Sequence, residues 1–80
     1  MSLTDTRLRR DLLRELVRRS VESNMVDIKV IAGIVYLTGE LIPVRGVQMN
    51  LKREREEIEE AMRQFRGVRG VVNEIKIPLL

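Results

Sequence analysis

The 80-residue chain contains no cysteine and no histidine. The missing cysteines exclude disulfide bonds, thiol nucleophiles and thiolate metal sites. The missing histidines exclude catalytic triads, imidazole general bases and the usual zinc and haem ligands, because histidine is the side chain that ordinarily titrates near neutral pH. The double absence predicts a protein that is not an enzyme, with no catalytic residues, no metal and no cofactor.

Aromatic residues are almost absent as well, since Tyr36 and Phe65 are the only two and there is no tryptophan. The core therefore has to be aliphatic. Hydrophobic residues make up 44% of the chain, which favours a folded protein over a disordered one. A chain of this length fits one domain over residues 1–80, and it buries only about 60–65% of its unfolded surface. Such a small domain gains from association with a copy of itself or with a larger protein.

Long apolar runs are also missing. The N-terminal segment MSLTDTRLRRDLLREL carries charges within its first seven residues, and no apolar run of 18 residues occurs anywhere. These features predict neither a signal peptide nor a membrane span, so the expected location is the cytoplasm, with peripheral association to a membrane as an option. The formal net charge of +3 permits attraction to anionic lipid or nucleic acid without requiring it.

Residues 26–41, VDIKVIAGIVYLTGEL, have the alternation of two half-buried strands. A two-residue turn at Ala32-Gly33 would place Val30 opposite Val35 and Ile28 opposite Leu37, with all four side chains on one face. Alanine is not ideal at a positive φ angle, so a three-residue bulged loop is the competing register. Either register predicts a β-hairpin.

An amphipathic helix is predicted over residues 4–22, with Thr4 or Asp5 as its N-cap. Three of its arginines, Arg7, Arg14 and Arg18, fall on the side opposite the apolar residues. The apolar stripe of this helix comprises Leu8, Leu12, Leu13, Leu16 and Val17.

A second helix is predicted over residues 47–65, with Gly67 ending it, and a third strand over residues 70–77. The apolar face of this second helix comprises Leu51, Ile58, Ala61, Met62 and Phe65. The order αββαβ predicts an α+β fold with a three-stranded mixed sheet and both helices packed on one face. The crossover through the second helix should make the last two strands parallel.

Two segments of the chain resemble the BON domain, a family found in bacterial osmotic-shock and nodulation proteins. They are DIKVIAGIVYLTGEL at residues 27–41 and FRGVRGVVNEIKI at residues 65–77. The residues that fall on the family pattern are Gly33, Val35, Leu37, Gly39, Gly67, Val68, Val71, Asn73, Ile75 and Ile77. The second helix departs from the family because it is rich in arginine and glutamate instead of alanine, and the connection at residues 41–50 is longer than usual. The resemblance implies binding to phospholipid surfaces or a role at the cell envelope, without catalysis.

The connection after the hairpin is the first candidate surface, because it places branched apolar residues where polar ones are the norm. The candidates are Leu41, Ile42, Val44, Arg45 and Val47. Alternatively, these residues cap the core of a small domain. The helix arginines Arg7, Arg14 and Arg18 are the second candidate, for contact with lipid headgroups, and a solvated face is the alternative.

The segment Gly67–Gly70 matches the G-x-x-G of nucleic-acid-binding KH domains, but a strand follows it, so it is interpreted as a helix stop and a strand entry. Asn73 is expected to hold adjacent backbone. The favoured partner is an anionic lipid surface or an envelope component. The alternative is a protein partner, including a second copy in a homodimer, and nucleic acid is the least favoured.

Overall fold

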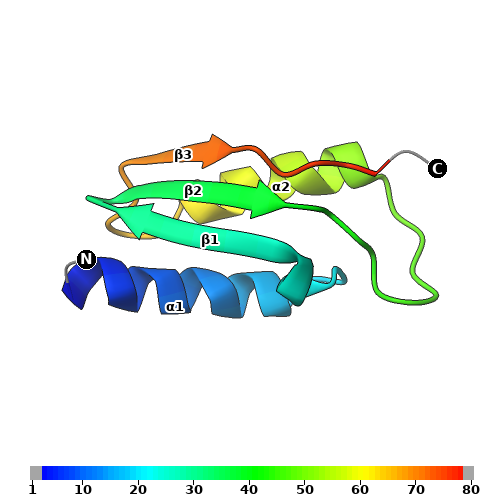
Figure 1. The fold of residues 1–80 in the computed structure, drawn as a ribbon, viewed down its shortest axis with the longest axis horizontal. Helices are drawn as coiled ribbons and strands as arrows, with labels where there is room; N and C mark the ends of the chain where they lie inside the picture. The colour runs from blue at the N-terminus through cyan, green and yellow to red at the C-terminus, as the bar shows by residue number, and fades with distance from the viewer. Residues whose placement is uncertain (1–2, 79–80) are drawn as a thin grey trace.

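The computed structural model describes residues 3–78 and shows two helices packed against a three-stranded sheet (Figure 1). The sheet order is β1-β2-β3, with β1 and β2 antiparallel and β2 and β3 parallel. The elements are α1 (Leu3–Val17), η1 (Ser23–Met25), β1 (Val26–Ile31), β2 (Ile34–Gly39), α2 (Leu51–Arg63) and β3 (Gly70–Asn73). The predicted αββαβ order and mixed sheet are confirmed.

The hairpin adopts the register of the two-residue turn. Val30 pairs with Val35 and Ile28 pairs with Leu37, so the bulged alternative is wrong. Ala32 has a φ of 50° and Gly33 a φ of 82°, which places both turn residues in the left-handed region. A turn with two such residues matches the twist of the strands that it joins, although the first position is strained for alanine.

The core lies on one face of the sheet, and both helices cover that face. α1 packs along β1, whereas α2 packs along β3. Strand side chains that are fully buried there include Val30, Val35 and Leu37, and the helices add Leu12, Leu16, Ile58 and Met62. The predicted aliphatic core and its inward-facing strand residues are confirmed.

The pairing of the C-terminal segment with β2 continues beyond β3. The Lys76 N–H donates to the Gly39 carbonyl over 2.8 Å, and the Leu41 N–H donates to the Lys76 carbonyl over 2.9 Å. The side chain of Ile75, the residue before Lys76, is buried in the core. The strand predicted over residues 70–77 is therefore present as β3 followed by a short paired extension.

The first helix is shorter than the predicted span of residues 4–22. It ends at Val17, whose side chain is 59% exposed, so the assignment of Val17 to the buried stripe is wrong. Residues 20–22 leave the helix because they pair with the connection after β2, and the buried side chain of Val21 joins the core from there.

Both predicted helix starts are also corrected. Thr4 and Asp5 lie inside the first turn of α1, so neither is its N-cap. The second helix begins at Leu51, where the Asn50 side chain accepts a hydrogen bond from the Arg53 N–H over 3.1 Å. Residues 47–50, which were predicted as the start of this helix, therefore belong to the connection between β2 and α2.

Candidate binding surfaces

The connection between β2 and α2 extends from the end of the sheet opposite the hairpin turn (Figure 1). Hydrogen bonds fix its base to the segment that follows α1. The Glu22 N–H donates to the Ile42 carbonyl over 2.7 Å, and the Val44 N–H donates to the Ser20 carbonyl over 3.0 Å. Backbone hydrogen bonds to residues 20–22 therefore fix the first half of this connection.

Leu41 does not belong to the candidate surface. Its side chain is fully buried in the core. It continues the inward-facing alternation of Val35 and Leu37 along β2, and its N–H pairs with the Lys76 carbonyl. Alternation along a strand carries a side chain to the same face every second residue, which is why this residue caps the core as the alternative interpretation expected.

The tip of the connection has a different character. The Val47 N–H donates to the Val44 carbonyl over 3.0 Å, which closes a turn around Arg45 and Gly46. Arg45 is exposed, whereas Ile42, Val44 and Val47 are half-buried. We call the segment from Ile42 to Val47 the apolar loop. It combines partly hydrated branched side chains with one exposed cation.

The three candidate arginines on the first helix segment are all exposed, and the part of the chain that the structure describes shows no ion pair for any of them. Arg14 lies in the last turn of α1 and Arg18 directly follows that helix, so both are near the base of the apolar loop. Arg7 lies in the first half of α1, the half from which Asp5 contacts the hairpin turn. Along the helix axis, Arg14 and Arg18 therefore lie toward the end of α1 from which the chain continues to residues 20–22, which pair with the loop, whereas Arg7 lies toward the opposite end.

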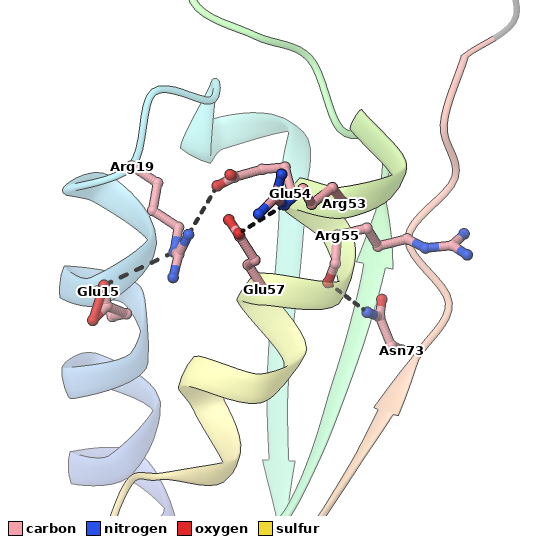
Figure 2. A network of polar contacts seen from close by, with 7 residues as sticks. All are labelled: Glu15, Arg19, Arg53, Glu54, Arg55, Glu57 and Asn73. Atoms are coloured by element: carbon pink, nitrogen blue, oxygen red, sulfur yellow. Dashed lines mark hydrogen bonds and ion pairs between the residues drawn. The ribbon is translucent and has the colours of Figure 1, made fainter. Parts of the chain in front are cut away.

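An ion pair joins the segment that follows α1 to α2, close to the same end of the molecule (Figure 2). Arg19 Nη1 lies 3.0 Å from Glu54 Oε2, and their side chains are only 22% and 14% exposed. Glu15 adds a weaker contact at 3.9 Å. Sequence reasoning missed this pair, and the available signal was Glu54, which interrupts the apolar face of the second helix.

Asn73 connects β3 to α2, also seen in Figure 2. Its Nδ2 donates to the Arg55 carbonyl over 3.3 Å, and its Oδ1 accepts from the Ile75 N–H over 3.2 Å. The Arg55 side chain in turn donates to the Ile75 carbonyl over 3.1 Å. The expectation that Asn73 holds adjacent backbone is confirmed.

The segment Gly67–Gly70 leads from α2 into β3 and lies against the hairpin turn. The Arg69 N–H donates to the Gly33 carbonyl over 2.8 Å, which fixes the segment beside the hairpin turn. The interpretation as a helix stop and strand entry is confirmed. Within residues 3–78 no group of three acidic, histidine or cysteine side chains is arranged to hold a metal ion. No helix in that range is long and apolar enough to cross a membrane.

Comparison with known proteins gives one family match. A model of the BON domain matches residues 48–78, which include α2, β3 and the paired extension. No curated protein matches the chain. The match contains the second of the two segments on which the resemblance was based, residues 65–77, while the hairpin lies outside it. The resemblance to the BON domain family is thereby confirmed.

Proposed function

Taking the chain as a BON domain, we propose that it is a non-catalytic module that associates with anionic phospholipid surfaces through the apolar loop. The observation that carries this proposal is the turn at the loop tip, where Arg45 is exposed beside the half-buried Val44 and Val47. Contact with a lipid surface needs both features, because apolar side chains gain by leaving water and cations gain from the negative surface potential.

The charges near the loop add to the attraction. Arg45, Arg14 and Arg18 are exposed, and within residues 3–78 they have no acidic partner in ion-pair distance. Each arginine near an anionic surface contributes about 1 kcal/mol, so three of them support weak and reversible binding that falls as salt increases.

The pairing at the loop base also favours binding. Hydrogen bonds from Glu22 to Ile42 and from Val44 to Ser20 hold the loop in its extended position before any surface is met. A segment that is ordered in advance loses less conformational entropy on binding than a free one.

The test is co-sedimentation with vesicles of phosphatidylglycerol and phosphatidylcholine, compared with phosphatidylcholine alone, at about 0.05 M and 0.5 M salt. We expect binding to the anionic vesicles at low salt and its loss at high salt. Arg45→Glu should weaken binding about tenfold or more, because it replaces attraction with repulsion at the tip. Arg7→Glu is the matched control, with the same charge change at the far end of α1, and should have a smaller effect.

Two results would overturn the proposal. The first is equal binding to neutral and anionic vesicles, and the second is an Arg45→Glu variant that binds as tightly as the unmodified protein.

A further inference from the structure

The outer face of the sheet is covered by neither helix in the part of the chain that the structure describes. Side chains that alternate away from the core there are Asp27, Lys29, Ile31, Ile34, Tyr36, Thr38, Val72, Glu74 and Lys76. Ile31 is 56% exposed and Val72 is 40% exposed. Tyr36 pairs with Val72 and Ile31 pairs with Ile34, so the apolar side chains gather at the hairpin end.

The edges of this sheet are less available than its face. On β1, Arg9 Nε donates to the outward Ile28 carbonyl over 2.8 Å. Beyond β3, the Ile75 N–H is bonded by Asn73 and the Ile75 carbonyl by Arg55. Side chains that occupy edge groups in this way oppose the addition of a further strand. These contacts occupy part of each edge, whereas no helix covers the outer face in the part of the chain that the structure describes.

The outward side chains of β1, together with the exposed Met25 that precedes this strand at the end of η1, form a self-complementary series. In chain order they are Met25, Asp27, Lys29 and Ile31: apolar, negative, positive, apolar. Met25 is 43% exposed, and both charged residues are exposed. When one copy of this series runs antiparallel to a second copy, each negative charge lies opposite a positive charge. The apolar residue at one end then lies opposite the apolar residue at the other end.

We propose that two copies of this chain associate face to face through the outer face of the sheet, with their β1 strands antiparallel. A two-fold axis perpendicular to the strands places Asp27 against the partner's Lys29, and Met25 against the partner's Ile31. The contact is then isologous, with every interaction occurring twice. This association is independent of the lipid binding proposed above, because it uses a different surface.

The contact is expected to be weak. Three short strands offer less than the ~800 Å² that each partner buries in a standard interface. A dissociation constant on the order of 10 µM or higher is therefore expected, well within the reach of sedimentation velocity.

The test is a charge-reversal series measured by sedimentation velocity from about 10 µM to about 1 mM protein. Asp27→Lys and Lys29→Asp should each weaken association about tenfold, because both symmetry-related ion pairs become repulsive. The double variant, D27K with K29D, should restore association, because the complementary series is rebuilt in reverse. The two single variants change the net charge in opposite directions, so a net-charge effect would not weaken both.

Controls separate this proposal from lipid binding. Arg45→Glu should leave the dimer unchanged, whereas it should weaken vesicle binding. A protein that stays monomeric over the whole concentration range would overturn the proposal. A double variant that associates no better than the single variants would also overturn it. A Lys29→Asp variant that loses vesicle binding while its association is unchanged would overturn it as well, because the outer face would then be a lipid surface.

Discussion

Asp5 and Gly33 lie 28 residues apart in the chain, and Asp5 Oδ1 accepts a hydrogen bond from the Gly33 N–H over 3.2 Å. The second carboxylate oxygen accepts from the Ala32 N–H over 3.0 Å. Asp5 is buried in the first turn of α1, so this carboxylate ties the start of the helix to the hairpin turn. The contact connects the N-terminal helix to the sheet at the end opposite the apolar loop.

We expect Asp5→Ala to lower the free energy of unfolding by about 1–3 kcal/mol, because the Gly33 N–H would be buried without an acceptor. Asp11→Ala is the control, since it makes the same change on the same helix at a half-buried position. Urea denaturation of the two variants measures the difference. A loss of less than about 0.5 kcal/mol relative to the control would contradict this role for Asp5.

The turn residue Ala32 offers a stabilising substitution. Its φ of 50° is costly for alanine, whereas asparagine tolerates the left-handed region and Asn-Gly is favoured in this kind of turn. Ala32→Asn should raise stability by about 0.5–1 kcal/mol, and Ala32→Val should lower it because a β-branched side chain resists positive φ. Thermal unfolding of both variants checks the opposite signs, and two shifts of the same sign would argue against the observed turn.

Two glycines with similar backbone angles should respond very differently to alanine. Gly39 has a φ of 104°, and an added Cβ would lie 2.2 Å from the Met25 carbonyl oxygen. Gly46 has a φ of 87°, but nothing lies within 4 Å of its added Cβ. Gly46→Ala should cost about 1–2 kcal/mol from backbone strain alone. Gly39→Ala adds a clash with backbone and should cost clearly more, which chemical denaturation can measure; equal losses would contradict the close approach at Gly39.

The Arg19–Glu54 pair should contribute more than an exposed ion pair. Because both side chains are largely buried and belong to different segments, we expect a coupling of about 1 kcal/mol in a double-mutant cycle of alanine variants. The exposed Arg53–Glu57 pair, at 3.5 Å within α2, should give about 0.3 kcal/mol. A coupling for Arg19 and Glu54 that is no larger than this control would show that the contact does not hold α2 against the segment that follows α1.

The hairpin and the face that it buries could be predicted from the sequence because their determinants are local, although the sequence leaves the register open between a two-residue turn and a three-residue bulged loop. Alternation of apolar and polar residues at a period of two decides which side chains face the core. The structure then decides between the two turn lengths, because Val30 pairs with Val35. The third strand could be predicted for the same reason, since Ile75 and Val71 share the inward parity.

The helix ends and the loop depend on contacts between distant residues. Nothing near Val21 indicates that it would leave the first helix to pair with Pro43. Asp5 has the residue type of an N-cap, but its carboxylate accepts hydrogen bonds from two N–H groups of the distant hairpin turn, which no local pattern indicates. Among the apolar residues after β2, Leu41 continues the alternation of the strand and is buried in the core, whereas Ile42 is half-buried. Which of these residues is buried depends on how far the strand pairing extends beyond β2.

We proposed that the apolar loop contacts an anionic lipid surface, and a single fluorescent reporter beside the loop can detect that contact. The chain has no tryptophan, so Gln48→Trp, at an exposed position directly after the loop, provides the only indole signal. Thr38→Trp, on the outer face of the sheet, is the matched control. We expect phosphatidylglycerol vesicles to shift the emission of the Gln48→Trp variant to the blue and to leave that of the Thr38→Trp variant unchanged. An unshifted Gln48→Trp variant, or a larger shift in the control, would contradict the proposal.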